Sequence, residues 1–178
     1  MATAIAEPKL FSKSTKPAEA SSTDPRSGKY LTFRLAKEEF AIQVLRVREI
    51  MGMQDITAVP QTPPYMKGVI NLRGKIVPVV DLRLKFGFPE VEATPATCII
   101  VVQLKSGKDT LLMGLLVDAV SEVLNFSPAD IENTPDFGHG VTTPYLLGIA
   151  KVKGTVKILL NIDEVLSTSE VQHLEAIL

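Results

Sequence analysis

One stretch of about twenty residues occurs twice in the chain, the second time 80 positions after the first. The first copy, Tyr65–Phe86, holds two apolar runs rich in β-branched residues on either side of the short charged segment Arg73-Gly74-Lys75. This pattern is typical of a tight β-hairpin. The matching positions carry similar residues: Tyr65 and Tyr145, Gly68 and Gly148, Val69 and Ile149, Leu72 and Val152, Gly74 and Gly154, Ile76 and Val156. The sequence therefore predicts equivalent hairpins at Gly68–Leu82 and Gly148–Ile162.

A second block repeats with a shift of 73 positions. Its paired residues are again alike: Phe40-Ala41-Ile42 and Met113-Gly114-Leu115, Val44 and Val117, Val47 and Val120, Glu49 and Glu122, Ile50 and Val123. The change of shift between the blocks corresponds to short loop insertions, which are readily tolerated. Together the blocks predict the duplication of one all-β unit of about 75–80 residues. Many short strands between glycine and proline turns favour two small barrels over a parallel α/β fold.

The repeat and the composition divide the chain into five segments. Residues 1–29 are rich in Ala, Ser, Thr, Lys and Pro, and we expect them to form a disordered tail. The first barrel unit covers 30–86, a link covers 87–97, and the second barrel unit covers 98–166. Exchange of strands between the two barrels stays open. Residues 167–178 are predicted to form a C-terminal helix that begins with a capping box of Ser167 and Glu170.

Three local patterns predict features of the first unit. Asp81, like Asn161 in the second unit, is expected to cap a single helical turn. Leu45–Met51 has the apolar spacing of a short helix. Pro78 cannot donate a hydrogen bond within a sheet, so its strand is expected to lie at an edge or to carry a bulge there.

Composition restricts the class of protein. With 178 residues, of which 46% are hydrophobic, the chain can bury a substantial core. The net charge of −1 creates no overall field that would attract nucleic acid or anionic lipid. The single cysteine excludes an internal disulfide, and the sequence shows neither a signal-peptide pattern nor an apolar run that could span a membrane. We therefore expect a soluble cytoplasmic protein.

Residues suited to catalysis or metal binding are sparse. The chain has only two histidines, no Gly-Lys pair is followed by Ser or Thr, and the aspartates do not cluster. Cys98 opens an apolar run, which favours a small buried hydrophobe over a nucleophile. The sequence thus predicts a protein that is not an enzyme and that holds no cofactor and no metal.

The repeat also places an acid and a base in each copy. Glu49 matches Glu122, and Arg73 matches Lys153 at the hairpin tip. We expect Glu49 and Arg73 to lie within salt-bridge reach of each other. Such a pair can simply steady its unit, which is usually worth only ~0–1 kcal/mol, or it can shape a recognition surface. Spacing alone favours the first interpretation.

The segment Gly68–Arg83, GVINLRGKIVPVVDLR, closely resembles the signature of the CheW family of chemotaxis coupling proteins. The resemblance extends over Lys29–Leu166 and includes Glu38-Glu39-Phe40, Val47–Ile50 and Gly114–Asp118. It implies two SH3-like five-stranded barrels packed together, in agreement with the repeat.

The same resemblance implies a function. Members of this family are non-catalytic adaptors that join methyl-accepting chemoreceptors to the histidine kinase CheA, and the receptor's cytoplasmic helical tip docks near the groove between the barrels. The family positions tied to receptor coupling match Val47, Glu49, Gly68, Arg73 and Gly74. The resemblance therefore implies that the Glu49–Arg73 pair lies beside this groove.

The resemblance also implies a kinase contact. The kinase's regulatory domain is itself similar to the adaptor, and the two meet barrel to barrel, with Cys98 near the matching edge. The strands that begin at Ile76 and Cys98 are more apolar than a solvated barrel wall requires, so we expect the kinase to cover them on the first barrel. No phosphoacceptor, ATP-binding or receiver segment accompanies the adaptor, which disfavours CheA itself and the receiver-bearing CheV.

Three alternatives stay open. The same adaptor can serve a non-flagellar pathway, such as one for twitching motility or biofilm signalling. A small barrel that binds RNA should show a basic face with interleaved aromatic residues, but only 6% of the residues are aromatic. An enzyme would need a convergent polar pocket, for which the sequence offers no obvious set of residues.

Overall fold

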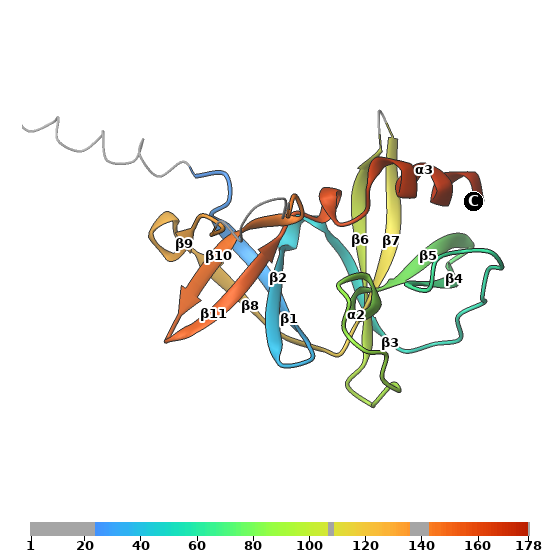
Figure 1. The fold of residues 1–178 in the computed structure, drawn as a ribbon, viewed down its shortest axis with the longest axis horizontal. Helices are drawn as coiled ribbons and strands as arrows, with labels where there is room; N and C mark the ends of the chain where they lie inside the picture. The colour runs from blue at the N-terminus through green and yellow to red at the C-terminus, as the bar shows by residue number, and fades with distance from the viewer. Residues whose placement is uncertain (1–23, 107–108, 136–142, 178) are drawn as a thin grey trace, which may run out of the picture.

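The computed structural model describes residues 24–106, 109–135 and 143–177, which form two SH3-like barrels side by side (Figure 1). Barrel 1 has the strand order β8-β1-β2-β11-β10-β9, with β1 (Gly28–Leu35), β2 (Glu38–Gln43), β8 (Ala119–Phe126), β9 (Ile131–Glu132), β10 (Leu146–Val152) and β11 (Thr155–Leu160). Barrel 2 has the order β3-β6-β7-β5-β4, with β3 (Val47–Gly52), β4 (Met66–Leu72), β5 (Lys75–Asp81), β6 (Cys98–Ser106) and β7 (Asp109–Val117). The helical elements are η2 (Val44–Arg46), α2 (Leu82–Lys85), η3 (Pro128–Asp130), η4 (Ile162–Glu164) and the C-terminal α3 (Thr168–Ile177). The predicted all-β fold with short helical turns and a C-terminal helix is confirmed.

The two barrels share one strand order, which confirms the duplication. Strands β1, β2, β8, β10 and β11 of barrel 1 correspond to β6, β7, β3, β4 and β5 of barrel 2. The antiparallel registers agree residue by residue: Phe33 pairs with Phe40 and Val120, and Val102 pairs with Met113 and Val47. The one parallel ladder in each barrel agrees as well: Leu159 lies opposite Ala41, and Val79 lies opposite Gly114. Phe40 and Met113, Val47 and Val120, and Ala41 and Gly114 are related by the shift of 73 positions, and Val79 and Leu159 by the shift of 80. Phe33 and Val102 are 69 positions apart, so the first strands match at a shift of their own.

Each barrel takes strands from both sequence repeats. The chain forms β1 and β2 in barrel 1, crosses at η2 to form β3–β7 in barrel 2, and crosses back after Val117 to form β8–β11. The segments 30–86 and 98–166 are therefore units of sequence. Each barrel combines the first two strands of one unit with the later strands of the other, so the two barrels are exchanged halves of a duplicated chain.

The two repeated hairpins have the same backbone geometry. Each ladder has a bulge at the same point, between Met66 and Gly68 in β4 and between Leu146 and Gly148 in β10. Each base is closed by the same hydrogen bond: Asp81 N donates to Tyr65 O at 2.7 Å, and Asn161 N donates to Tyr145 O at 2.8 Å. The prediction that these hairpins are equivalent elements of two barrels is confirmed.

Three clusters of buried apolar side chains stabilise the fold. Small clusters around Tyr30, Phe126 and Leu159 and around Ile70, Val77 and Val79 belong to barrel 1 and barrel 2, respectively. The largest cluster combines both barrels and includes Phe33, Phe40, Ile42, Ile100, Val102 and Leu115. A row of ring contacts extends it, with centroids 6.0 Å apart for Phe33–Phe40, 5.7 Å for Phe40–Phe86 and 5.2 Å for Phe86–Tyr145. The barrels are thus joined by a shared core as well as by the two crossovers.

Strand β6 is buried on both of its faces. Residues 99–102 are fully buried, because successive side chains point alternately to the shared cluster and to the interior of barrel 2. The strand also lies between β3 and β7 in the sheet. The expectation that a partner covers this strand is therefore wrong, since the fold itself buries the apolar run.

One further local expectation is wrong, and another is wrong in part. Leu45–Met51 forms no helix: η2 ends at Arg46, and the chain continues as β3 because pairing with β6 outweighs the local apolar spacing. Pro78 lies in β5, which is an interior strand between β7 and β4 and not an edge, but the β4–β5 ladder does carry a bulge one residue pair away from the Pro78–Val69 pair, between Met66 and Gly68. Its missing N–H is tolerated there because the ladder between β5 and β7 starts only at Val79.

The predicted caps are present. Asp81 Oδ1 accepts the N–H of Arg83 at 2.9 Å, and Asn161 Oδ1 accepts the N–H of Asp163 at 3.2 Å. Asp81 is the last residue of β5 and Asn161 directly follows β11, so each cap lies where the strand ends and a helical turn starts, at the same place in both repeats.

The ordered fold begins before residue 30. Gly28 and Lys29 belong to β1, and Arg26 Nη1 donates to Asn133 Oδ1 at 3.0 Å on barrel 1. The predicted tail includes residues 1–23, which lie outside the described residues. At the other end, the predicted capping box of α3 is present, with Ser167 N 2.8 Å from Glu170 Oε1 and Glu170 N 3.2 Å from Ser167 Oγ.

Candidate functional site

The tip of the β4–β5 hairpin exposes the Arg73 side chain. Leu72 and Lys75 form the last pair of the ladder, so Arg73 and Gly74 are the two central residues of the turn. Both have positive φ, 51° for Arg73 and 89° for Gly74, as a type I′ turn requires. Glycine adopts this conformation without steric cost, and the Gly74 N–H donates to Asn71 Oδ1 at 2.8 Å. Gly74 therefore fixes the turn that positions Arg73.

The Arg73 side chain forms a salt bridge with Glu49 on β3, as predicted, with Arg73 Nη2 donating to Glu49 Oε1. The Arg73 side chain is 76% exposed and that of Glu49 is 27% exposed. Solvent screens so exposed a pair, and it contributes little to folding stability. Its charges are accessible to a partner molecule.

A hollow of about 460 Å³ opens beside this ion pair. We call it the tip hollow, and its lining residues are Arg48, Glu49, Leu72, Arg73, Lys75, Gln103, Thr110 and Leu112. Three cations and one carboxylate make it net positive, and two leucines add apolar surface. Every lining residue belongs to barrel 2, so the tip hollow lies on that barrel alone, whereas we expected the ion pair beside the groove between the barrels.

Gly68 supports the site through its backbone. It is buried with φ 142°, and a Cβ atom at this position would lie 2.0 Å from the carbonyl oxygen of Thr57. Thr57 and Val69 exchange two backbone hydrogen bonds of 2.9 Å, so the segment before β4 runs directly against that strand. Only glycine permits this approach, and Gly68 thereby fixes the path of the chain into the hairpin.

Val47 is a packing residue at the crossover. It opens β3 opposite Val102 and packs, partly buried, against the shared cluster. A bulge in the ladder follows between Val47 and Glu49. Val47 therefore anchors the start of the strand that carries Glu49.

Cys98 lies apart from these residues. It opens β6 opposite Gly52, at the far end of the β3–β6 ladder from Val47, and it packs half-buried against the shared cluster. Burial raises the pKa of its thiol, which keeps the group protonated at neutral pH. This matches the interpretation of Cys98 as a small hydrophobe. Because β6 is an interior strand, Cys98 does not lie on a free strand edge.

The structure thus brings Glu49, Arg73 and Gly74 together at one surface, with Gly68 and Val47 supporting it from below. Sequence reasoning does not single out three further residues of the tip hollow, Arg48, Lys75 and Leu112. The two cations are sequence neighbours of Glu49 and Gly74, which is the only signal that marks them. Leu112 has no local signal, because the fold brings it in from β7.

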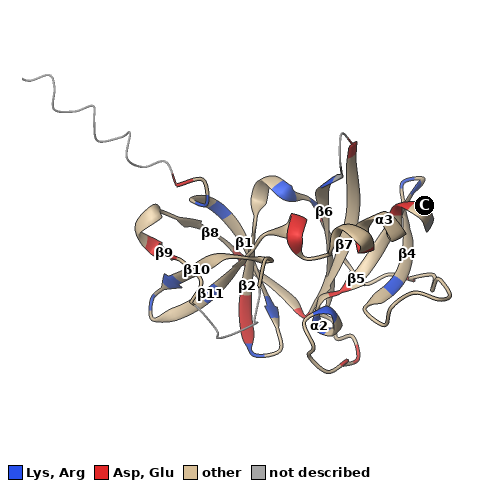
Figure 2. Cartoon of the chain, turned by 45° about the horizontal axis from the view of Figure 1, so that its top comes forward, with Lys and Arg blue, Asp and Glu red and all other residues tan. Residues whose placement is uncertain are grey.

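Elsewhere, charged residues of both signs are spread over both barrels (Figure 2). Within the described ranges, no three His, Cys, Asp or Glu side chains lie close enough together to hold a metal ion. The helices of that part of the chain are all too short or too polar to cross a membrane.

A family model described as a CheW-like domain matches residues 29–170. The chain belongs to the CheW family. The chemotaxis protein CheW of Rhizobium meliloti is 38% identical over 140 residues, which cover 79% of this chain and 88% of that protein. The chemotaxis protein CheW of Klebsiella aerogenes is 38% identical over 141 residues, which cover 79% and 82%, respectively. The crystal structure of the scaffolding protein TtCheW from Thermoanaerobacter tengcongensis matches with a TM-score of 0.70 and 32% identity, covering 81% of this chain and 97% of that one.

Membership of the CheW family identifies this chain as a chemotaxis adaptor. The assignment agrees with the fold, which matches that of a CheW scaffolding protein.

Proposed function

We propose that this CheW-family adaptor joins methyl-accepting chemoreceptors to the histidine kinase CheA without catalysing a reaction itself. The receptor's cytoplasmic helical tip docks at Glu49, Arg73 and Gly74, with Gly68 and Val47 holding these residues in place. The adaptor then works in the cytoplasm, at arrays of membrane-bound receptors. The observation that carries the proposal is the exposed Arg73–Glu49 ion pair beside the tip hollow.

The chemistry of the tip hollow suits a helix with mixed side chains. Leu72 and Leu112 offer apolar contact, while Arg48, Arg73 and Lys75 outnumber the single carboxylate of Glu49. Complementary charge at such a surface mainly provides specificity and speeds association. A receptor helix fits this surface if it places an apolar residue over the two leucines and polar residues against the charged side chains at the rim.

The kinase's regulatory domain binds a different part of the adaptor, near Cys98. Burial of β6 leaves that strand unavailable, so apolar contact must come from exposed side chains near Gly52, the strand partner of Cys98, such as Ile50 and Met53, which are 46% and 42% exposed. We expect kinase affinity to depend only modestly on salt, because apolar burial dominates it. Receptor affinity should fall more steeply, since exposed charges are screened over about 8–10 Å near physiological ionic strength.

Calorimetric titration of the purified adaptor with a receptor-tip fragment and with the kinase regulatory domain tests the proposal. Arg73→Ala should weaken receptor binding on the order of tenfold and leave kinase binding intact. The matched control is Lys153→Ala, at the equivalent turn of barrel 1, and it should change neither affinity. Absence of binding to both partners would overturn the adaptor role, and equal receptor affinities of the wild type and Arg73→Ala would overturn the assigned surface.

A further inference from the structure

The base of the β4–β5 hairpin is held from outside the barrel. Tyr65 comes directly before β4, and Lys85 ends α2, which follows β5, so the two residues mark the two ends of the hairpin unit. Lys85 Nζ lies 4.5 Å from the centroid of the Tyr65 ring. The two ends are thus already in contact with each other through a cation–π interaction.

Glu170 of α3 binds both of these residues with one carboxylate oxygen. Lys85 Nζ lies 2.7 Å from Glu170 Oε2, and the Tyr65 hydroxyl donates to the same atom. The other oxygen accepts the N–H of Ser167 at 2.8 Å in the helix cap. The Lys85 and Glu170 side chains are only 20% and 25% exposed, so this pair is better shielded from water than the Arg73–Glu49 pair.

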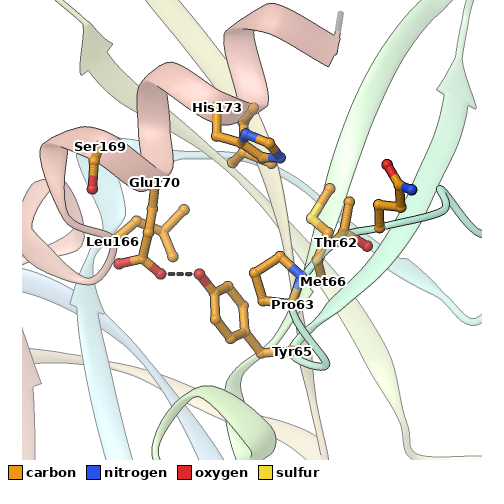
Figure 3. Close-up of a pocket in the computed structure, with 10 residues that line it drawn as sticks. Thr62, Pro63, Tyr65, Met66, Leu166, Ser169, Glu170 and His173 are labelled. Carbon is orange, nitrogen blue, oxygen red and sulfur yellow. Dashed lines mark hydrogen bonds between the residues drawn. The ribbon is translucent and has the colours of Figure 1, made fainter.

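Away from Glu170, α3 does not fill the space toward the hairpin. A pocket of about 360 Å³ separates the helix from the segment before β4, with Pro63 and Met66 on one side and Ser169, His173 and Leu174 on the other. Figure 3 shows the helix and this segment facing each other across the pocket, with the hydrogen bond from Tyr65 to Glu170 spanning it at one end. The polar connection between α3 and the hairpin base is therefore concentrated at Glu170.

The described part of the second repeat, 98–106, 109–135 and 143–166, shows no such arrangement. Tyr145, the equivalent of Tyr65, stacks on Phe86 with a centroid distance of 5.2 Å. The position equivalent to Lys85 is Val165, which is buried in the shared cluster. Among the described residues, the hairpin of barrel 1 is therefore closed by apolar packing, and only the hairpin of barrel 2 is held by a charged group on the C-terminal helix.

We propose that Glu170 is a positioning residue for receptor binding: through Tyr65 and Lys85 it clamps the base of the hairpin whose tip carries Arg73. This inference rests on the proposed function, because it concerns the same receptor surface. A hairpin fixed at its base presents its tip in one orientation, so less motion has to be frozen when a partner binds. The C-terminal helix thereby supports a site that it does not touch.

The test uses the full chain with Glu170→Gln, which removes the charge that binds Lys85; its single amide oxygen can accept either the Ser167 N–H of the cap or the Tyr65 hydroxyl, but not both. We expect receptor-tip affinity to fall roughly 3- to 10-fold, as for loss of one charge-assisted hydrogen bond, while affinity for the kinase regulatory domain stays unchanged. Tyr65→Phe, which removes one hydroxyl, should shift affinity in the same direction. The matched control is Glu132→Gln, which removes an exposed ion pair with Lys151 on barrel 1 and should have no effect.

A double-mutant cycle separates positioning from general stability. If Glu170 acts through the hairpin tip, Glu170→Gln should weaken receptor binding much less in an Arg73→Ala background than in the wild type. Fully additive effects, or an equal loss of kinase affinity, would overturn the clamp. The two proposals fail differently: unchanged receptor affinity in Arg73→Ala contradicts the docking surface, whereas a loss in Arg73→Ala but in neither Glu170→Gln nor Tyr65→Phe contradicts the clamp alone.

Discussion

The two repeated hairpins share a backbone but differ in what their tips do. Arg73 and Lys153 occupy the same turn position with φ of 51° and 49°. Arg73 pairs with Glu49, whereas Lys153 and Glu122, both in the described part of the chain, form no salt bridge; in barrel 1 it is Lys151 that pairs, with Glu132, at 3.1 Å. Duplication therefore preserved the geometry of the turn, and the ion pair that marks the candidate site exists in one copy only.

The two barrels also differ in the strand pairs that lead to the hairpin tips. Lys157 and Glu39 lie opposite each other in barrel 1 and form an ion pair, with side chains 10% and 28% exposed. The equivalent residues in barrel 2 are Val77 and Leu112, which belong to the barrel's apolar cluster and its margin, and Leu112 lines the tip hollow. Barrel 1 thus carries a charged pair where barrel 2 provides an apolar wall for its hollow.

The two crossovers show a third difference, in which the charges are reversed. At the first crossover, Arg46 Nη1 lies 2.8 Å from Asp163 Oδ2 on η4. At the second, Asp118 pairs with Arg83 of α2 and also accepts the N–H of Ala36 at 2.8 Å. Both crossovers are therefore tied to the helical turn that follows a hairpin, although the cation and the anion have changed places.

The largest expected effect comes from the glycines at the two bulges. Gly68→Ala should destabilise the protein by roughly 2–4 kcal/mol, because the added Cβ meets Thr57 O and the φ of 142° suits only glycine. Gly148→Ala should cost less, about 1–3 kcal/mol, since its Cβ would lie 2.9 Å from Glu132 O without an unfavourable φ. Urea denaturation of both variants measures the difference. Equal losses of unfolding free energy would contradict a larger steric cost at Gly68 than at Gly148.

The ion pair of Glu39 and Lys157 gives the next largest expected effect on stability. Glu39→Ala leaves Lys157 without its partner in a largely buried position and should cost about 1–3 kcal/mol. Replacing both residues by those of barrel 2, as Glu39→Leu with Lys157→Val, should be close to neutral, because an apolar pair needs no compensating charge. Denaturant midpoints of the single and double variants decide the matter. A double variant as unstable as Glu39→Ala would mean that the pair has a role beyond mutual compensation.

The fold and the Arg73–Glu49 ion pair can be predicted from the sequence because both rest on positions that match between the two copies of the repeat. The matching positions place Arg73 at a hairpin tip and Glu49 after the second strand of its unit, in a segment that the local pattern predicts as a helix. The exchange of strands is not readable from those shifts, since β2 followed by β3 looks the same whether the chain stays in one barrel or crosses to the other. Pairing between distant strands also explains why the helix predicted at Leu45–Met51 and the partner contact predicted on β6 are wrong. A local pattern does not reveal which strands pair with the segment in the sheet.

The contacts of Glu170 with Tyr65 and Lys85 could not be predicted from the sequence either, because Glu170 and Tyr65 each already have an explanation in the sequence. The capping box with Ser167 accounts for Glu170 locally, and Tyr65 is accounted for by the repeat. Only the packing of α3 against barrel 2 shows that the carboxylate also binds Tyr65 and Lys85. A residue with one complete local explanation gives no signal of a second partner that lies 105 positions away.

The pair of Arg46 and Asp163 at the first crossover predicts a response of stability to acid. The Arg46 guanidinium lowers the pKa of Asp163 below its usual value, against a smaller opposing effect of burial. A lowered pKa in the folded state means that this stabilisation is fully present above the unfolded value of about 3.9 and is lost as pH falls through the folded value. Asp163→Asn should therefore lower the unfolding free energy at pH 7 and flatten its dependence on pH below about 4. Denaturation of both proteins from pH 7 to pH 3 checks this, and parallel curves would contradict it.

The smallest expected effect on stability belongs to the residue with the clearest proposed role. Arg73→Ala should change the free energy of unfolding by less than about 1 kcal/mol, because the side chain is 76% exposed and its ion pair is screened by solvent. Lys153→Ala, which breaks no salt bridge described in the structure, should change it by even less. Thermal denaturation at low and high salt separates them: the small Arg73→Ala effect should shrink as salt rises, whereas Lys153→Ala should show no salt response. A loss of more than about 2 kcal/mol in Arg73→Ala would be on the scale of a buried ion pair. It would mean that the Arg73–Glu49 pair stabilises barrel 2. Weaker receptor binding by Arg73→Ala would then have to be explained by unfolding and not by loss of recognition.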